Sequence, residues 1–322
     1  MSLETEAILD RRRLRRKLGI WRSLAIIGFV AVLAVFASVT SGKDTLIGQN
    51  QIARVTITGM ITEDRKQLQM LRKIGLAQHV KGVILAINSP GGTTAGAEAL
   101  FEEIRAIAEK KPVVAQFGTV AASAAYITGL ASDYIVARGN TITGSVGVIM
   151  QWPEVTGLLD KVGIKMNELK SGSLKAEPSL FQPISPEARR VTEEMIAEGQ
   201  SWFVGLVEER RNMKVDNVPG LREGRVYLGR SALKYNLVDE LGGEKAAISW
   251  MVQKRDVDAR TKVIDWEPEN EIDWPFARAL SAFSSKVVVN TLEEVGKSTT
   301  LGNQVSRLTL DGLVSVWKPG RN

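Results

Sequence analysis

Apolar and polar positions along the middle of the chain predict strands and helices in alternation. The strand-like segments are short apolar runs rich in β-branched residues, whereas the segments between them carry apolar residues at helical spacing. Alternation of this kind predicts right-handed βαβ units and an α/β fold, and continuous apolar runs are typical of a parallel sheet covered on both faces. The expected strands are 51–61, 81–87, 112–116, 134–137 and 165–170. The expected helices are 64–78, 94–110, 123–132 and 186–212.

Residues 23–42 are uncharged over 20 positions, the length at which a helix spans the hydrocarbon core of a bilayer. Residues 1–22 carry seven Lys or Arg against three acidic residues, which predicts a cytoplasmic N-terminus and an extracytoplasmic location for everything after Lys43. The alternative is a cleaved signal peptide with Val35-Phe36-Ala37 as its cleavage site. The length of the apolar run favours a retained transmembrane anchor.

The composition excludes several kinds of chemistry. The net charge is +6, but outside the first 22 residues 35 basic residues face 33 acidic ones, so nucleic acid is not an expected partner. There is no cysteine, which excludes disulfides, thiolate catalysis and cysteine metal sites. The one histidine, His79, stands in an apolar context typical of a structural role. A single histidine supplies too few ligands for a histidine metal site. We expect no metal and no cofactor.

Ser123 is the first candidate for chemistry, because it lies where an expected strand turns into an expected helix. A nucleophile at such a turn is exposed, and backbone N–H groups at the start of the helix stand ready for an oxyanion. The alternative is that Ser123 only caps the helix. Two further turns carry serine and glycine: residues 89–92, which match no phosphate-loop motif, and Ser145, which is expected to lead into a short strand.

A serine nucleophile needs a base, because its hydroxyl hardly ionises at neutral pH. Cysteine is absent and His79 is part of no matching motif, so lysine remains. Spacing alone does not select one lysine.

Five motifs in the same order resemble those of the bacterial signal peptide peptidase A family (SppA). They are NSPGG at 88–92, AASAAY at 121–126, TGSVGVI at 143–149, KSGSLK at 170–175 and GRVYLGRSA at 224–232. The resemblance covers roughly 51–252, and each motif occurs once, as in the short, single-repeat form of the family. It implies a ClpP/crotonase-like fold of repeated β-β-α units behind an N-terminal transmembrane helix.

The resemblance also implies roles for particular residues. Ser123 would be the nucleophile, and Lys175, 52 positions later, the general base. Ser145 would hydrogen-bond and orient the lysine amine. The backbone N–H groups of Gly91 and Ala124 would form the oxyanion hole. Alanine stands at 124, 125 and 176, where the family commonly has two glycines and an acidic residue, but neither departure removes a catalytic group.

The implied protein is a membrane-anchored serine endopeptidase that degrades cleaved signal peptides and misfolded proteins at the outer, periplasmic face of the cytoplasmic membrane. In short-form relatives the serine and the lysine meet across a subunit interface, so we expect a homo-oligomeric ring with shared active sites. The expected organisation is a cytoplasmic basic segment (1–22), an anchor (23–42), a protease domain (43–257) and an extension of unknown role (258–322).

Two other functions remain open at this point. One is a crotonase-like acyl-CoA enzyme on the same fold, which the predicted anchor and the lack of an acid/base carboxylate pair disfavour. The other is a non-catalytic membrane scaffold. Loss of peptide hydrolysis on substitution of Ser123 or Lys175 would separate these functions from the protease.

Overall fold

The structure, a computed structural model, describes residues 21–23, 26–29, 49–268 and 314–316. The chain divides into two units, Met1–Gln49 with Asn270–Thr300, and Asn50–Glu269 with Leu301–Asn322. The described residues of the first unit are two short helical stretches and Gln49. The second unit contains all the strands and helices discussed below.

The predicted membrane anchor lies mostly outside the described residues, since only Ser23 and 26–29 of the span 23–42 belong to them. Within the described ranges, no helix combines the length and the apolar character needed to cross a bilayer. The anchor therefore stays a prediction.

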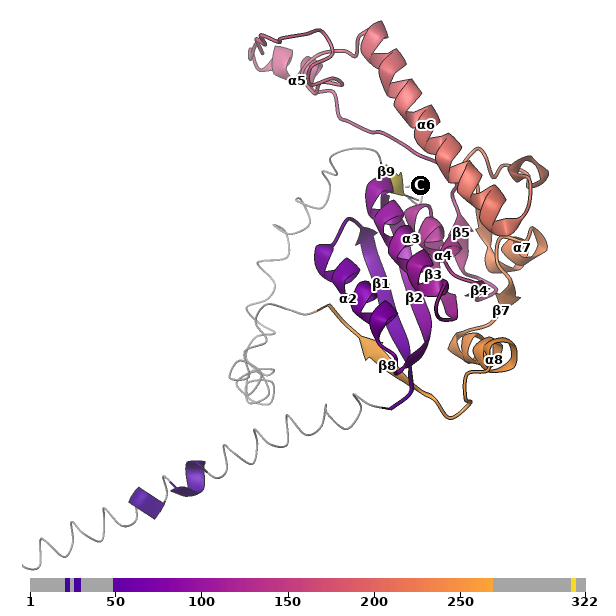
Figure 1. Ribbon diagram of the computed structural model, residues 1–322. Coiled ribbons are helices and arrows are strands. Elements are labelled where there is room, and N and C mark those ends of the chain that lie inside the picture. Colours follow the sequence, from indigo (N-terminus) through magenta and orange to yellow (C-terminus); the bar gives the residue numbers. More distant parts are fainter. Residues whose placement is uncertain (1–20, 24–25, 30–48, 269–313, 317–322) are drawn as a thin grey trace, which may run out of the picture. The chain divides into compact units, whose positions relative to one another are not determined.

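The second unit is a mixed α/β structure whose described strands form one sheet (Figure 1). The strands are β1 (Gln51–Ile61), β2 (Val80–Thr93), β3 (Val113–Ala122), β4 (Tyr134–Ala137), β5 (Ile142–Gly144), β6 (Val226–Leu228), β7 (Glu240–Leu241), β8 (Lys262–Trp266) and β9 (Val314–Val316). The helices are α2 (Arg65–Leu76), α3 (Thr94–Ala108), α4 (Ala124–Leu130), α5 (Thr156–Lys161), α6 (Pro186–Arg211), α7 (Gly229–Lys234) and α8 (Glu244–Arg255), with a 3-10 turn at Val215–Asn217.

The sheet is mainly parallel, as the sequence predicts. Its strand order is β6-β5-β3-β2-β1-β8, with β4 between β3 and β7 and with β9 paired to β2. Only the pairs β5–β6 and β2–β9 are antiparallel among the described strands. The first half of β3 pairs with β4 and its last three residues pair with β5, so β3 reaches past β4 toward the end of the sheet where β5 begins.

Apolar side chains alternate between two cores, one on each face of the sheet. On one face Ile84, Val114 and Val136 pack against Ala247 and Met251 of α8. The residues next to them in sequence point into a larger core beneath α2, α3, α4 and α6. Burial on both faces explains why these strands are continuous apolar runs rather than alternating ones.

Two details of the predicted secondary structure are wrong. Residues 165–170 form no strand; they are almost all exposed, and a strand without a partner to pair with is not stable. The short strand near Ser145 precedes this serine, as β5, rather than following it. Strands β8 and β9 fall in the part of the sequence where alternation is lost, and the sequence did not indicate them.

Candidate active site

The last residues of β2 and the turns that follow β3 and β5 meet at the carboxyl-terminal ends of these strands. The register pairs Ser89 with Ala121 and Ala122 with Gly144. Gly91, Ser123 and Ser145 follow these pairs. They therefore lie together at the carboxyl-terminal end of the parallel strands, which we call the sheet edge. Ligands of open parallel sheets bind at this edge.

Ser123 forms a sharp turn between β3 and α4. Its φ is 60° and its ψ is −122°, a conformation that costs a residue with a side chain about 1–3 kcal/mol. Its N–H donates to the carbonyl of Gly144 at 2.9 Å, and its own carbonyl accepts the N–H groups of Tyr126 and Ile127 at 2.8 and 3.1 Å. The Ser123 side chain makes no capping bond to α4, so the capping role is not the one observed. The expectation that this serine is exposed is wrong for the single chain, because Ser123 is fully buried.

Ser145 directly follows β5 and also has a positive φ, of 53°. Because Ala122 pairs with Gly144, the parallel register brings Ser145 beside Ser123. The N–H of Ser145 donates to the carbonyl of Arg225 at 2.9 Å. A Cβ at Gly144 would lie 2.8 Å from the ring of Tyr227. Glycine at 144 therefore lets the motif at 143–149 pack closely against the motif at 224–232.

Residues 89–92 do not form the turn expected from the sequence but belong to the last part of β2, where Ser89 bonds to Gly91. The Gly91 N–H donates to Ser89 Oγ at 3.1 Å, and Ser89 Oγ lies 3.3 Å from the Gly91 carbonyl. Gly91 has a φ of 122°, which favours glycine. Gly92 is required for a different reason, because a Cβ there would lie 1.8 Å from the carbonyl oxygen of Ile61 in β1.

The structure of one chain does not bring Lys175 to Ser123. Lys175 is exposed and belongs to the long segment between β5 and α6 that also contains α5 (Figure 1). Within residues 149–187 only Ser179 is buried. We call residues 149–187 the arm. Ser123, Ser145 and Gly91 thus converge at the sheet edge, while the predicted base stands apart.

Other candidate bases are unsuitable. Lys170 contacts Glu177 at 2.8 Å and Glu168 at 2.9 Å, and these hydrogen bonds raise the pKa of the Lys170 amine. Burial lowers the pKa of Lys111, but Lys111 lies before β3, at the opposite end of the sheet from Ser123. His79 also lies at that opposite end, directly before β2, where it stacks on Trp266.

Three polar residues at this edge were not predicted as functional. Ser89 holds Gly91, and the Oδ1 of Asn88 accepts the N–H groups of Thr119 and Val120, both at 3.1 Å. Both residues lie in the NSPGG motif, which was interpreted only through its glycines. The amide of Gln200 in α6 donates to the carbonyls of Val146 and Arg222, at 3.2 and 3.0 Å, and nothing in the sequence marks it.

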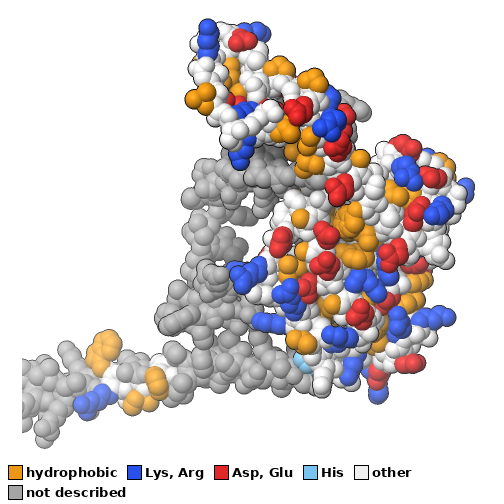
Figure 2. Space-filling model, turned by 45° about the horizontal axis from the view of Figure 1, so that its top comes forward, with side chains coloured by type: hydrophobic (Ala, Val, Ile, Leu, Met, Phe, Trp, Pro, Cys, Tyr) orange, Lys and Arg blue, Asp and Glu red, His pale blue; other side chains and the backbone are white. Residues whose placement is uncertain are grey.

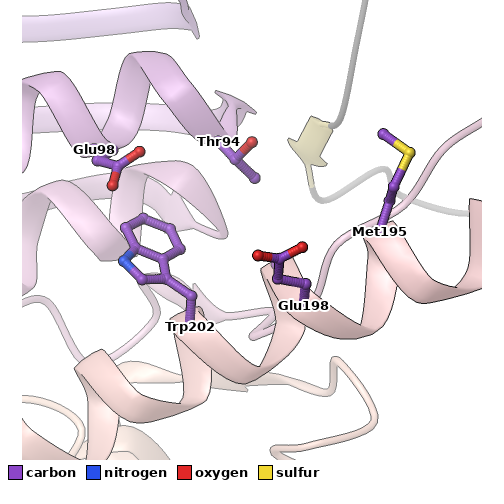
Figure 3. A pocket seen from close by; sticks show the side chains of 6 residues that line it. Thr94, Glu98, Met195, Glu198 and Trp202 are labelled. Carbon is purple, nitrogen blue, oxygen red and sulfur yellow. The ribbon is translucent and has the colours of Figure 1, made fainter.

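A cavity of about 350 Å³ lies between α3 and α6, next to the same edge (Figure 3). Thr94, the residue that follows β2, and Trp202 are among its lining residues. It offers no metal chemistry of its own: no group of three His, Cys, Asp or Glu suited to a metal occurs within the described ranges.

Comparison with known proteins identifies the family. The pattern described as peptidase family S49 matches residues 105–258, which include Ser123, Ser145 and Lys175. A candidate protease of Methanocaldococcus jannaschii is 32% identical over 73% of this chain and 79% of its own length. A candidate signal peptide peptidase SppA of Enterococcus faecium is 30% identical over 78% of this chain and 79% of its own length. Protease 4 of Haemophilus influenzae is 29% identical over 69% of this chain and 38% of its own length.

Two of these relatives reach 30% identity over more than two thirds of their length, and the matched region contains the strained serine turn between β3 and α4. The chain therefore belongs to peptidase family S49 and is a serine protease.

Proposed function

We propose that the chain is a serine endopeptidase with a Ser123–Lys175 dyad. The observation that carries this proposal is the conformation of Ser123, a buried serine held at φ 60° where β3 turns into α4. Backbone strain of this kind persists only where the surrounding structure enforces it, and it is concentrated at functional sites. The serines at 123 and 145 also lie side by side, as the proposed mechanism needs.

The proposed reaction is hydrolysis of a peptide bond through an acyl-enzyme. The uncharged amine of Lys175 takes the proton of Ser123 Oγ as this oxygen attacks the carbonyl carbon, and then gives the proton to the leaving amine. Water attacks the resulting ester in a second step of the same kind. Ser145 orients the lysine amine throughout.

The N–H groups of Gly91 and Ala124 would receive the negative charge that develops on the carbonyl oxygen. In the structure, the Gly91 N–H donates to Ser89 Oγ. Redirecting the Gly91 N–H toward an oxyanion breaks this hydrogen bond, at a net loss of about 0.5–1.5 kcal/mol. It also forms a charge-assisted hydrogen bond to the oxyanion.

Lys175 would reach Ser123 of a neighbouring subunit in a homo-oligomeric ring. The arm that carries Lys175 exposes large apolar side chains, and such side chains lie on the surface of this part of the chain in Figure 2. Examples are Leu158, Val162, Ile164 and Leu169. Burying the arm against a second copy would remove this apolar surface from water and would favour the uncharged form of the lysine amine.

The remaining parts of the proposal concern location and substrate. Residues 23–42 would anchor the chain in the cytoplasmic membrane, with 1–22 in the cytoplasm and the protease domain, a ClpP/crotonase-like fold over 43–257, outside. The substrates would be cleaved signal peptides and misfolded proteins. The charge pattern of the first 42 residues supports the orientation, and the name of the Enterococcus relative supports the substrate class. No specific observation favours an acyl-CoA enzyme or a scaffold.

The test is peptide hydrolysis by the full chain in detergent, together with labelling by a fluorophosphonate. We expect Ser123→Ala to abolish both, and Lys175→Ala to lower kcat by at least about 10³-fold, because base and acid catalysis are lost together. Lys165→Ala is the matched control, since Lys165 is another exposed lysine of the arm. Full activity of Lys175→Ala would contradict the dyad.

A further inference from the structure

Gln200 in the middle of α6 connects the loop that contains Ser145 to a second loop, which precedes β6. Its Nε2 donates to the carbonyl of Val146 at 3.2 Å and to the carbonyl of Arg222 at 3.0 Å. Val146 directly follows Ser145, and Arg222 lies four residues before β6. One side chain therefore ties both loops to the same helix.

The second loop holds Ser145 from its other side. The Ser145 N–H donates to the carbonyl of Arg225 at 2.9 Å, and the Arg225 N–H donates to the carbonyl of Gly220 at 3.0 Å. Arg222 lies within the loop that this second hydrogen bond closes. Gln200 thus holds the Ser145 backbone in two ways, directly through the next carbonyl and indirectly through the loop to which the Ser145 N–H is bonded.

The Gln200 side chain makes these contacts with one of its own polar atoms left buried. Both N–H groups of the amide have acceptors, but its Oε1 is buried and has no hydrogen-bond partner among the described residues. It faces the same loop, because a Cβ at Gly147 would lie 4.0 Å from it. Buried acceptors without a partner are rare and costly. An apolar side chain of similar length would avoid this cost, so the two donated hydrogen bonds are the feature that explains a glutamine here.

The hydrogen bond to Val146 also closes the base of the segment that carries Lys175. The arm, residues 149–187, begins three residues after Val146 and leads into α6, which returns to the sheet edge at Gln200 (Figure 1). The same amide therefore holds two proposed parts of the reaction, the loop of Ser145 and the base of the arm.

We propose that Gln200 is a positioning residue, which fixes Ser145 where its hydroxyl orients the amine of Lys175 toward Ser123. This proposal rests on the proposed function of Ser145. Gln200 contacts neither the substrate nor the reacting atoms and acts through Ser145. Small displacements of a group that orients the reacting atoms lower the rate strongly. The loss falls on kcat rather than on KM, because Ser145 acts on the base and not on the bound peptide.

The kinetic test compares Gln200→Met with the unsubstituted full chain in detergent. Methionine is close to glutamine in length and volume, so the fold is retained, but both donated hydrogen bonds are lost. We expect kcat for a peptide substrate to fall by at least about tenfold, with KM unchanged within about twofold. Gln116→Met is the matched control, since Gln116 is also half-buried and its amide donates to the adjacent Phe117 carbonyl at 3.0 Å. It should keep both constants. An unchanged kcat in Gln200→Met, or an equal loss in the control, would overturn the proposal.

A double-mutant cycle tests whether Gln200 acts through Ser145. Gln200→Met is introduced into the unsubstituted chain and into a chain with Ser145→Ala, and kcat is measured for all four chains. We expect Gln200→Met to cause no further loss where the Ser145 hydroxyl is already absent. The same fold-loss in both backgrounds would mean a general structural role and would overturn the proposal.

A third measurement does not depend on catalysis. Amide hydrogen exchange is compared for chains with and without Gln200→Met, all carrying Ser123→Ala. We expect exchange at Ser145–Gly147 to become at least about fivefold faster, while exchange in β2 stays unchanged. Identical exchange at Ser145–Gly147 would overturn the proposal, whatever the activity. If the unsubstituted chain hydrolyses no peptide, the proposed function fails. The exchange data then decide alone whether Gln200 fixes the Ser145 loop, as they do if Ser145→Ala leaves no measurable rate.

Discussion

The sheet edge and the arm differ in how firmly they fix the residues of the proposed active site that each contributes. At the edge, Ser123, Ser145 and Gly91 are each buried and fixed by backbone hydrogen bonds or by close packing of neighbouring strands. The arm, residues 149–187, is exposed except for Ser179, and it carries Lys175 in a local turn whose N–H donates to the carbonyl of Gly172 at 3.1 Å.

This difference indicates which half of the site is preorganised. The proposed nucleophile, Ser123, needs no further contacts to hold its backbone geometry, whereas the Gly91 N–H must first leave Ser89 Oγ to receive an oxyanion. The proposed base does need further contacts, because a lysine can act as a base only where its surroundings favour the uncharged amine, and Lys175 is exposed. A second copy of the chain is the simplest source of the missing contacts, since it would bury the apolar side chains of the arm and the lysine together.

The largest expected effect comes from combining two inactive variants. Chains with Ser123→Ala and chains with Lys175→Ala are co-expressed in equal amounts and purified as mixed assemblies. If each site takes its serine from one subunit and its lysine from the next, about a quarter of the sites in random rings contain both groups. Peptide hydrolysis should therefore return to about a quarter of the unsubstituted rate, from a background that is lower by orders of magnitude.

The control for this mixture replaces Lys175→Ala chains with chains carrying both substitutions. No site in that mixture contains a serine, so activity should stay at background. If the first mixture also stays at background although mixed rings form, the serine and the lysine belong to the same subunit, and the arm must close onto its own sheet edge.

The next largest effect distinguishes two glycines. Gly92→Ala places a Cβ 1.8 Å from the backbone of β1, which cannot move without opening the β1–β2 pair. We expect a loss of at least about 3 kcal/mol in the free energy of unfolding, measured by thermal or denaturant unfolding. Gly172→Ala in the arm has no atom within 4 Å and should change it by no more than about 0.5 kcal/mol. A large effect at Gly172 would mean that the arm is packed more tightly than its exposure indicates.

The same difference explains what the sequence could and could not predict. Strands β2 and β3 are buried on both faces, so their apolar runs were recognised. The segment 165–170, KMNELK, contains no β-branched or aromatic residue, and no described strand pairs with it, so its prediction as a strand had little local support. Strands β8 and β9 are short, and β9 is a three-residue edge strand with no local pattern to reveal it.

Within the site, residue types were predictable but register was not. Serine and glycine at strand ends indicated turns that could carry chemistry. That Ser123 and Ser145 lie side by side depends on the direct pairing of β3 with β5, although β4 comes between them in sequence, and no local pattern encodes this pairing. The role of Gln200 depends on the packing of α6 beside the loop after Ser145, and it likewise could not be predicted from the sequence.

A smaller effect separates two serines with the same local hydrogen bond. Ser89 and Ser179 each accept, at 3.1 Å, the N–H of the residue two positions later. Ser89→Ala removes the competitor for the Gly91 N–H, so we expect stability to fall by about 1 kcal/mol while kcat rises by up to about tenfold. Ser179→Ala loses the same bond in the arm and should produce no rise. An unchanged or reduced kcat in Ser89→Ala would argue against Gly91 as an oxyanion donor.

The smallest effect on the chain itself is expected at Leu169, a fully exposed apolar residue of the arm. Leu169→Ser removes no intramolecular packing, so the free energy of unfolding of the single chain should change by no more than about 0.5 kcal/mol. Leu71→Ser in α2 is the matched control: this leucine is fully buried, and the change leaves a cavity and a buried hydroxyl that together cost about 3 kcal/mol or more. If the arm meets a second copy, Leu169→Ser weakens assembly, measured by native mass or sedimentation, and lowers hydrolysis at low protein concentration. An unchanged assembly and rate would place Leu169 outside the contact and would shift the expected interface to the apolar residues around α5, Leu158 and Val162.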